Sequence, residues 1–218
     1  MKYKNILFDL DGTLTDSKPG IVNSLREALL CFEINPDVMD LTKFIGPPLM
    51  NTLVYTMGME HKKADAIVKK YREHYSDTGV YNNSLYDGVE EMLSYLKTNG
   101  HALFIATSKP LPFTNIVLEH FSISQYFNYV AASDFNRTFD TKQRIIEDIL
   151  KNCNIIDLSS TVMIGDTKFD ITAAKAVGIT AIGVLYGYGD YEELSASGAD
   201  FIVKDVKELF NIIKDEIQ

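Results

Sequence analysis

Apolar residues occur in this chain in two recurring patterns. Short, nearly continuous apolar runs predict strands that are covered on both faces. They fall at residues 6–8, 102–106, 129–130, 161–164, 180–184 and 201–203. Stretches in which apolar residues recur every three or four positions predict amphipathic helices. They fall at about residues 19–32, 48–57, 61–75, 89–96, 113–120, 141–151, 171–177 and 206–213. Strands that alternate with helices predict a doubly wound, parallel α/β sheet with a Rossmann-like core.

The stretch from residue 18 to about residue 80 departs from this alternation, because it contains helical patterns and no convincing strand. Its first helix has a candidate N-cap in Ser17 and a proline, Pro19, that a first helical turn tolerates. We therefore predict an all-helical subdomain at residues 16–82, inserted into an α/β core of residues 1–15 and 83–218. Hinges are expected near residues 15–16 and 82–83.

Small, polar and acidic residues follow four of the predicted strands. In chain order they are Asp9 and Asp11; Thr107, Ser108 and Lys109; Gly165, Asp166 and Asp170; and the run Tyr186-Gly187-Tyr188-Gly189. Any one of these groups has an ordinary explanation in a turn or a helix cap. In an open α/β sheet, however, ligands bind outside the carboxyl ends of the strands. The groups together therefore indicate a functional site at that edge.

The chemistry of these residues favours a divalent cation and a phosphorylated ligand. Carboxylates without paired His or Cys suit a hard cation, Mg²⁺ first of all, and Mg²⁺ usually shares its coordination with phosphate oxygens. Thr107 and Ser108 offer hydroxyl and backbone N–H donors near a helix N-terminus. Lysine is the usual point charge beside a phosphate, and Lys109 and Lys142 are both candidates.

Four motifs in order resemble the haloacid dehalogenase-like phosphohydrolases. Residues 9–17 read Asp-Leu-Asp-Gly-Thr-Leu-Thr-Asp-Ser and resemble the first motif, and Thr107-Ser108-Lys109-Pro110 resembles the second. Lys142 stands for the third and residues 165–170, Gly-Asp-Thr-Lys-Phe-Asp, for the fourth. The helical insert lies where the phosphoglycolate-phosphatase-like branch of this family carries its cap. The stretch 133–141 lacks the glycine that relatives often have before the third motif.

The resemblance implies a role for each matching residue. Asp9 would be the nucleophile that forms an aspartyl-phosphate, and Asp11 the general acid and base. Catalysis would further involve Thr107 and Lys142, while phosphate or substrate binding would involve Gly12, Thr107, Ser108, Lys142 and, from the insert, Lys43. The Mg²⁺ site would comprise Asp9, Asp11 through its carbonyl, Asp166 and Asp170, the last as an outer ligand or as a residue that orients Lys142.

The expected activity is Mg²⁺-dependent hydrolysis of a small phosphorylated metabolite, such as phosphoglycolate, a nucleoside 5′-monophosphate or a sugar phosphate. A phosphomutase of the same fold, similar to β-phosphoglucomutase, uses the same two aspartates and stays open as an alternative. A non-catalytic protein that binds a phosphometabolite ranks below both, because Asp9, Asp11, Lys142, Asp166 and Asp170 are all present.

Charge and composition limit the partners and the cellular compartment that we expect for this protein. The net charge of −9 argues against general affinity for nucleic acid or anionic membranes. No apolar run is long enough for a membrane span or a signal peptide, so a cytoplasmic protein, monomeric or homodimeric, is expected. Cys31 and Cys153 are predicted to be buried, reduced thiols.

Overall fold

The computed structural model describes residues 2–46, 49–134 and 141–215. The chain divides into two compact units. One comprises Met1–Asp16 and Leu85–Gln218, and the other comprises Ser17–Ser84. Within the part of the chain that the structure describes, no helix combines the length and the apolar character that crossing a membrane requires.

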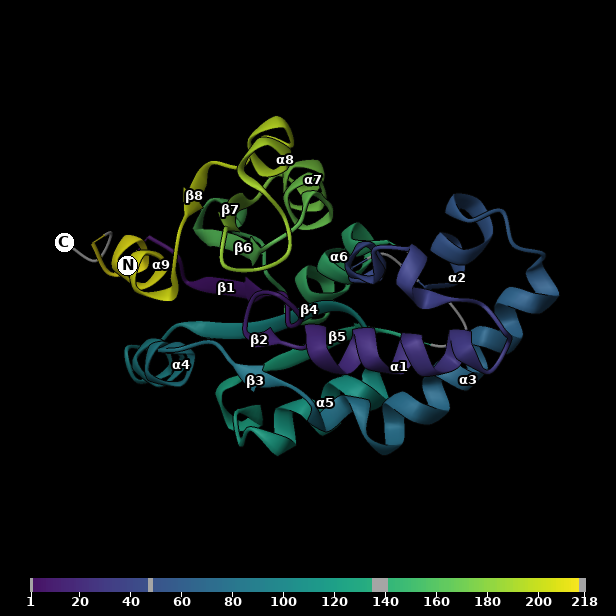
Figure 1. Cartoon of the computed structure of the whole chain (residues 1–218). Helices are drawn as coiled ribbons and strands as arrows, with labels where there is room; N and C mark the ends of the chain where they lie inside the picture. The colour runs from purple at the N-terminus through teal and green to yellow at the C-terminus, as the bar shows by residue number, and fades with distance from the viewer. Residues whose placement is uncertain (1, 47–48, 135–140, 216–218) are drawn as a thin grey trace. The chain divides into compact units, whose positions relative to one another are not determined.

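The larger unit is built on a six-stranded sheet in which every pair of neighbouring strands is parallel (Figure 1). The spatial order is β5-β4-β1-β6-β7-β8. The strands are β1 (Asn5–Phe8), β4 (Ala102–Pro110), β5 (Tyr129–Ser133), β6 (Thr161–Gly165), β7 (Thr180–Val184) and β8 (Phe201–Val203). Strand order reverses at β1, which pairs with β4 on one side and β6 on the other, and such a switch point is where this fold binds ligands. The predicted fold class is confirmed.

Helices cover both faces of this sheet. They are α4 (Val89–Thr98), α5 (Leu111–His120), α6 (Lys142–Asn152), α7 (Lys168–Val177), α8 (Tyr191–Ala196) and α9 (Val206–Asp215). Figure 1 shows α6 and α7 on the side of the sheet opposite α4 and α5. Alternate side chains of a strand point to opposite faces, so Leu7 and Met163 join the cluster formed with Ile145 and Ile171 of α6 and α7.

Two elements of the larger unit differ from the prediction. Strand β4 continues past residue 106 to Pro110, with a register shift against β5 between Thr107 and Pro110. Helix α8 was missed, because it has six residues and only Leu194 is buried, which is too short for a helical period to show. Its start is nonetheless marked, since the Asp190 carboxylate accepts a hydrogen bond from the Glu193 N–H at 2.8 Å.

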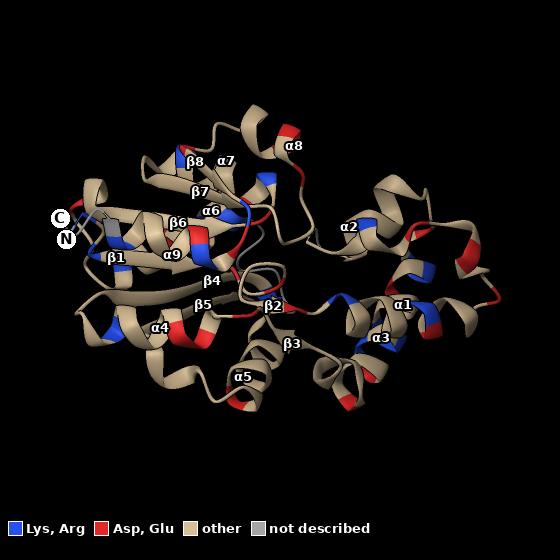
Figure 2. Ribbon diagram, turned by 60° about the vertical axis from the view of Figure 1, so that its left-hand side comes forward, with Lys and Arg blue, Asp and Glu red and all other residues tan. Residues whose placement is uncertain are grey.

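The smaller unit is helical, with α1 (Lys18–Leu30), α2 (Leu49–Asn51) and α3 (His61–Asp77). A π-helical turn, Thr52–Thr56, follows α2. Helices α1 and α3 pack together through a core that includes Leu25, Leu29, Leu53 and Ile67. Figure 2 shows basic and acidic positions mixed on α1 and α3. The chain crosses between the units through β2 (Thr15–Asp16) and β3 (Ser84–Leu85), a two-stranded sheet that the sequence pattern did not predict.

The predicted burial of both cysteines is wrong. Both thiols are free, but Cys31 is exposed and Cys153 is half-buried. Each occupies the C-cap position of its helix, α1 and α6 respectively, where the apolar stripe has just ended. Ser17 does stand at the N-cap of α1, but its side chain makes no capping hydrogen bond.

Leu7→Ala tests the packing of the central strand. Leu7 is fully buried between β4 and β6, so its truncation should lower the free energy of unfolding by about 2–5 kcal/mol. Urea denaturation followed by circular dichroism measures this. Ile156→Ala, at a side chain that is 91% exposed, is the control and should stay within about 0.5 kcal/mol of the parent. Equal shifts for the two variants would contradict the assigned core.

Candidate active site

Three carboxylates meet at the carboxyl edge of the sheet, on the β6 side of the switch point. Asp9 directly follows β1, Asp166 directly follows β6, and Asp170 lies in the first turn of α7. One oxygen from each lies within 4.8 Å of the others. Asp166 and Asp170 are fully buried, so neither is the solvated helix start that its place in the sequence allows.

Glycines let the backbone close around these acids. A Cβ atom at Gly12, whose φ is +82°, or at Gly187 would overlap the Asp166 side chain, and one at Gly165 would overlap Asp170. The loop after β7 thereby comes close enough for the Tyr188 N–H to donate to Asp166 Oδ2 at 2.8 Å. The Thr13 hydroxyl approaches Asp166 Oδ1 at 3.4 Å.

Burial and mutual repulsion disfavour the ionised form of the cluster. Burial raises the pKa of Asp166 well above its usual range, and the neighbouring Asp170 and Asp9 raise it further. Two unit charges about 5 Å apart repel by roughly 3 kcal/mol at the effective dielectric constant of a protein site. A bound cation would reverse this preference, because it favours the ionised carboxylates.

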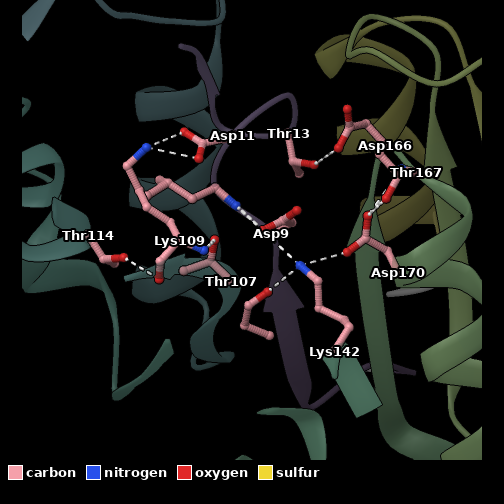
Figure 3. A network of polar contacts seen from close by, with 12 residues as sticks. Asp9, Asp11, Thr13, Thr107, Lys109, Thr114, Lys142, Asp166, Thr167 and Asp170 are labelled. Carbon is pink, nitrogen blue, oxygen red and sulfur yellow. Dashed lines mark hydrogen bonds and ion pairs between the residues drawn. The ribbon is translucent and has the colours of Figure 1, made fainter. Parts of the chain in front are cut away.

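Lys142 is the cation that the protein itself supplies. It is the first residue of α6, and its Nζ lies 2.9 Å from Asp9 Oδ1, 2.8 Å from Asp170 Oδ1 and 2.9 Å from the Ala106 carbonyl (Figure 3). Two carboxylates and one carbonyl thus surround the ammonium. Burial alone would lower the pKa of Lys142, but Asp170 and Asp9 outweigh it and raise the pKa.

Asp9 keeps a raised pKa despite this lysine. Burial raises the pKa to about 6, and the opposing effect of Lys142 is the smaller one. The Asp9 carboxylate also accepts the Leu10 N–H at 2.8 Å, which fixes its orientation. These contacts direct the Asp9 carboxylate toward the other two acids at the end of β1.

Asp11 lies apart from the three clustered acids. Its two carboxylate oxygens each lie 2.9 Å from Lys109 Nζ. Lys109 comes from the register-shifted end of β4, where its N–H donates to the Thr107 hydroxyl oxygen at 3.2 Å. Thr107 is buried, while Ser108 is half-buried. Figure 3 shows the Lys109–Asp11 pair on the opposite side of Asp9 from Asp166.

The structure thus gathers most of the residues that the sequence singled out. Asp9, Lys142, Asp166 and Asp170 form one network, and Asp11 pairs with Lys109. Lys43 is exposed in the helical unit, at the end of a short 3₁₀ helix, Leu41–Phe44. Within the glycine-free stretch 133–141, residues 135–140 lie outside the part of the chain that the structure describes. What sequence reasoning missed was the partner of Lys109 and the contacts that Thr13 and Tyr188 make with Asp166.

The fold and the site define a doubly wound α/β protein with an acidic centre at the switch point. Residues 6–184 match the family model of the haloacid dehalogenase-like hydrolases. The chain belongs to this family.

Relatives match over most of the chain. A 5′-nucleotidase of Pseudomonas aeruginosa is 37% identical over 215 residues, which are 98% of this chain and 97% of that protein. A phosphoglycolate phosphatase of Vibrio vulnificus is 31% identical over 97% of this chain and 96% of the relative. The tyrosine-protein kinase PtkA of Mycobacterium tuberculosis is 38% identical over 91% of this chain, which spans only 65% of that protein.

A solved structure extends the likeness to three dimensions. The crystal structure of a predicted phosphatase from Clostridium acetobutylicum superposes with a TM-score of 0.92 at 38% identity, covering 99% of this chain and all of the other.

Gly187→Ala tests whether the loop after β7 fixes Asp166. The added methyl group must displace the Asp166 side chain or the Gly12 carbonyl, so catalytic activity should fall at least about 10-fold, since misplacing a reacting group by 1 Å can cost 10²-fold. The control is Gly100→Ala, where φ is +84° and no atom lies within 4 Å of the new Cβ. It should lower stability by about 1 kcal/mol while activity per folded molecule stays unchanged. Unchanged activity in Gly187→Ala would show that the loop does not hold Asp166.

Proposed function

We propose that this chain is a Mg²⁺-dependent phosphomonoesterase that works through a phosphorylated Asp9. The observation that carries the proposal is the network at the sheet edge. Lys142 joins the Asp9 and Asp170 carboxylates, and Asp166 lies within reach of both acids. The names of the nucleotidase and the phosphoglycolate phosphatase relatives support phosphomonoester hydrolysis.

The donor set suits Mg²⁺, because it consists of carboxylate oxygens without imidazole or thiolate. Asp9, Asp166 and the Asp11 carbonyl would hold the ion. The two Asp170 oxygens are already engaged, Oδ1 by Lys142 and Oδ2 by the Thr167 N–H and hydroxyl, which supports an orienting role for Asp170. When bound, the cation would supply charge neutralisation beside the phosphoryl group.

In the first chemical step an Asp9 carboxylate oxygen attacks phosphorus. The new O–P bond forms as the bond from phosphorus to the ester oxygen breaks, and the leaving alcohol takes its proton from Asp11, which enters this step as the carboxylic acid and leaves it as the carboxylate. In the second step a water oxygen attacks the same phosphorus, its proton passes to Asp11, and the bond to Asp9 breaks. Inorganic phosphate is released and both aspartates regain their starting state.

The remaining side chains would bind and stabilise the phosphoryl group during its transfer. The Lys142 ammonium and the Thr107 hydroxyl, with the Ser108 N–H, would stabilise its oxygens as charge develops on them. Thr107 Oγ1 accepts a hydrogen bond from Lys109, so its own proton is available as a donor. The Gly12 backbone would complete the cradle.

A nucleoside 5′-monophosphate is the first substrate class to test, because the relative that covers nearly the whole chain at 37% identity is named a 5′-nucleotidase. Phosphoglycolate and sugar phosphates are the next. We further propose that the helical unit acts as a cap that excludes water from the reaction, with Lys43 as an anion-binding residue in it.

Asp9→Asn tests the nucleophile. The amide keeps the shape of the side chain but cannot attack phosphorus, so Mg²⁺-dependent release of phosphate from p-nitrophenyl phosphate should fall by at least about 10³-fold. Asp37→Asn is the matched control, because that carboxylate pairs with Arg26 on the surface and should keep full activity. Full activity in Asp9→Asn would refute the aspartyl-phosphate route.

A screen of phosphometabolites for free phosphate would then identify the substrate. With a hexose 1-phosphate, conversion into the 6-phosphate without release of phosphate would favour the phosphomutase alternative instead.

Mg²⁺ binding itself should be visible as a change in stability. Because the cation favours the ionised cluster in the folded state only, Mg²⁺ at 100 times its dissociation constant should add about 2.7 kcal/mol to the free energy of unfolding. Differential scanning fluorimetry with and without MgCl₂ measures the shift. In Asp166→Asn the shift should disappear while the metal-free protein stays folded, since the raised pKa shows that this acid is costly to ionise there. An equal Mg²⁺ shift in Asp166→Asn would exclude Asp166 as a ligand.

A further inference from the structure

A second lysine of the site, Lys109, contacts the second aspartate, Asp11. Lys109 Nζ lies 2.9 Å from both oxygens of the Asp11 carboxylate, and the two side chains are only 4% and 16% exposed. The pair is therefore largely shielded from solvent at the sheet edge. A shielded ion pair keeps one arrangement of its two side chains, whereas exposed partners sample many.

The backbone of Lys109 is fixed on both sides. Its N–H donates to the Thr107 hydroxyl oxygen at 3.2 Å, and its carbonyl accepts from the Thr114 hydroxyl of α5 at 3.3 Å. The register shift of β4 against β5 occurs at this point, and such irregularities re-aim side chains at the rims of sheets. The fixed backbone at the end of β4 therefore directs the Lys109 ammonium toward Asp11.

The two lysines are divided between the two aspartates. Lys142 contacts Asp9 and Asp170, while Lys109 contacts Asp11. Asp11 is absent from the group of acids whose oxygens meet within 4.8 Å, among the residues that the structure describes. The Asp11 carboxylate therefore lies beside Lys109 and apart from the three clustered acids (Figure 3).

We propose that Lys109 is the positioning residue that directs the Asp11 side chain toward the leaving group and away from the cation. The inference rests on the proposed function, in which Asp11 transfers the proton to the leaving alcohol and later takes one from water. An ion pair that were only structural would be a weak source of stability, because desolvation offsets most of the attraction.

Substrates with different leaving groups can distinguish a residue that positions Asp11 from one that binds phosphate or only stabilises the fold. An alkyl alcohol needs a proton as its bond to phosphorus breaks, whereas p-nitrophenolate leaves without one. The ratio kcat/KM covers only the steps up to departure of the alcohol. A misplaced Asp11 should therefore lower kcat/KM for an alkyl phosphate and spare kcat/KM for p-nitrophenyl phosphate. The second step still needs Asp11, so the phosphoenzyme should accumulate with both substrates.

The experiment compares Lys109→Met with the parent enzyme on p-nitrophenyl phosphate and on the best alkyl phosphomonoester from the metabolite screen. For the alkyl ester, kcat/KM should fall about 10-fold or more, within the roughly 10²–10⁴-fold range of a positioned acid–base group. For p-nitrophenyl phosphate, kcat/KM should stay within about 3-fold, since only a proton-dependent step is slowed. Rapid mixing should reveal a burst of p-nitrophenol before the steady state.

Lys175→Met is the matched control. Lys175 Nζ pairs with both oxygens of Asp200, at 2.7 and 2.9 Å, on the surface of the same unit, and its loss should change neither ratio nor burst. Because both substrates are assayed on one preparation, a partly unfolded Lys109→Met sample leaves the ratio of the two kcat/KM values unaffected. Asp11→Asn should show the same leaving-group selectivity, and the double variant should add little to it.

Two results would overturn the inference. An equal fall in kcat/KM for both esters, without a burst, would make Lys109 a phosphate-binding residue, and unchanged kinetics would leave it a structural ion pair. The Asp9→Asn variant keeps these failures separate from that of the proposed function. If Asp9→Asn is inactive and Lys109→Met is not selective, only the role of Lys109 is wrong. If Asp9→Asn is active, both proposals fall.

Discussion

The crowding of three carboxylates, two of them fully buried, beside one ammonium is the constraint on which the rest of this site depends. Asp9, Asp166 and Asp170 bring three negative charges to a place where Lys142 supplies one positive charge. Burial makes this arrangement costly, as the raised pKa values of Asp9 and Asp166 show. A further cation in the site would offset this cost, and this is the physical basis for proposing Mg²⁺.

The sheet topology places different kinds of residue on the two sides of that cluster. On one side of β1, β6 and α7 carry Asp166 and Asp170, and glycines let the backbone press against these two acids. On the other side, β4 carries Thr107 and Lys109 to Asp11. The reversal of strand order at β1 therefore separates an acidic half, suited to a cation, from a half that presents donors and a second lysine.

Much of this could be predicted from the sequence, for reasons that are local. Continuous apolar runs ending in Asp9, Thr107 and Asp166 define strands, and parallel strands bring their carboxyl ends to one edge. The family resemblance, confirmed by the match over residues 6–184, gave each of these residues an expected role. Short elements were missed, namely α8 and the two-residue strands β2 and β3, because a pattern needs several residues to show a period.

The pairing of Lys109 with Asp11 could not be predicted, and the reason is geometric. In sequence, Lys142 and, as the fallback, Lys109 are candidates for the cation beside the phosphate, and the pattern contains no information on rotamers or on the register shift at the end of β4. The shift lies in the segment that carries Lys109, whose ammonium reaches Asp11, whereas Lys142 reaches Asp9 and Asp170 from the start of α6. Two aspartates that are two residues apart thus acquire different partners and, in the proposed mechanism, different roles. Asp9 belongs to the acidic cluster and contacts Lys142, whereas Asp11 contacts Lys109 and lies outside that cluster.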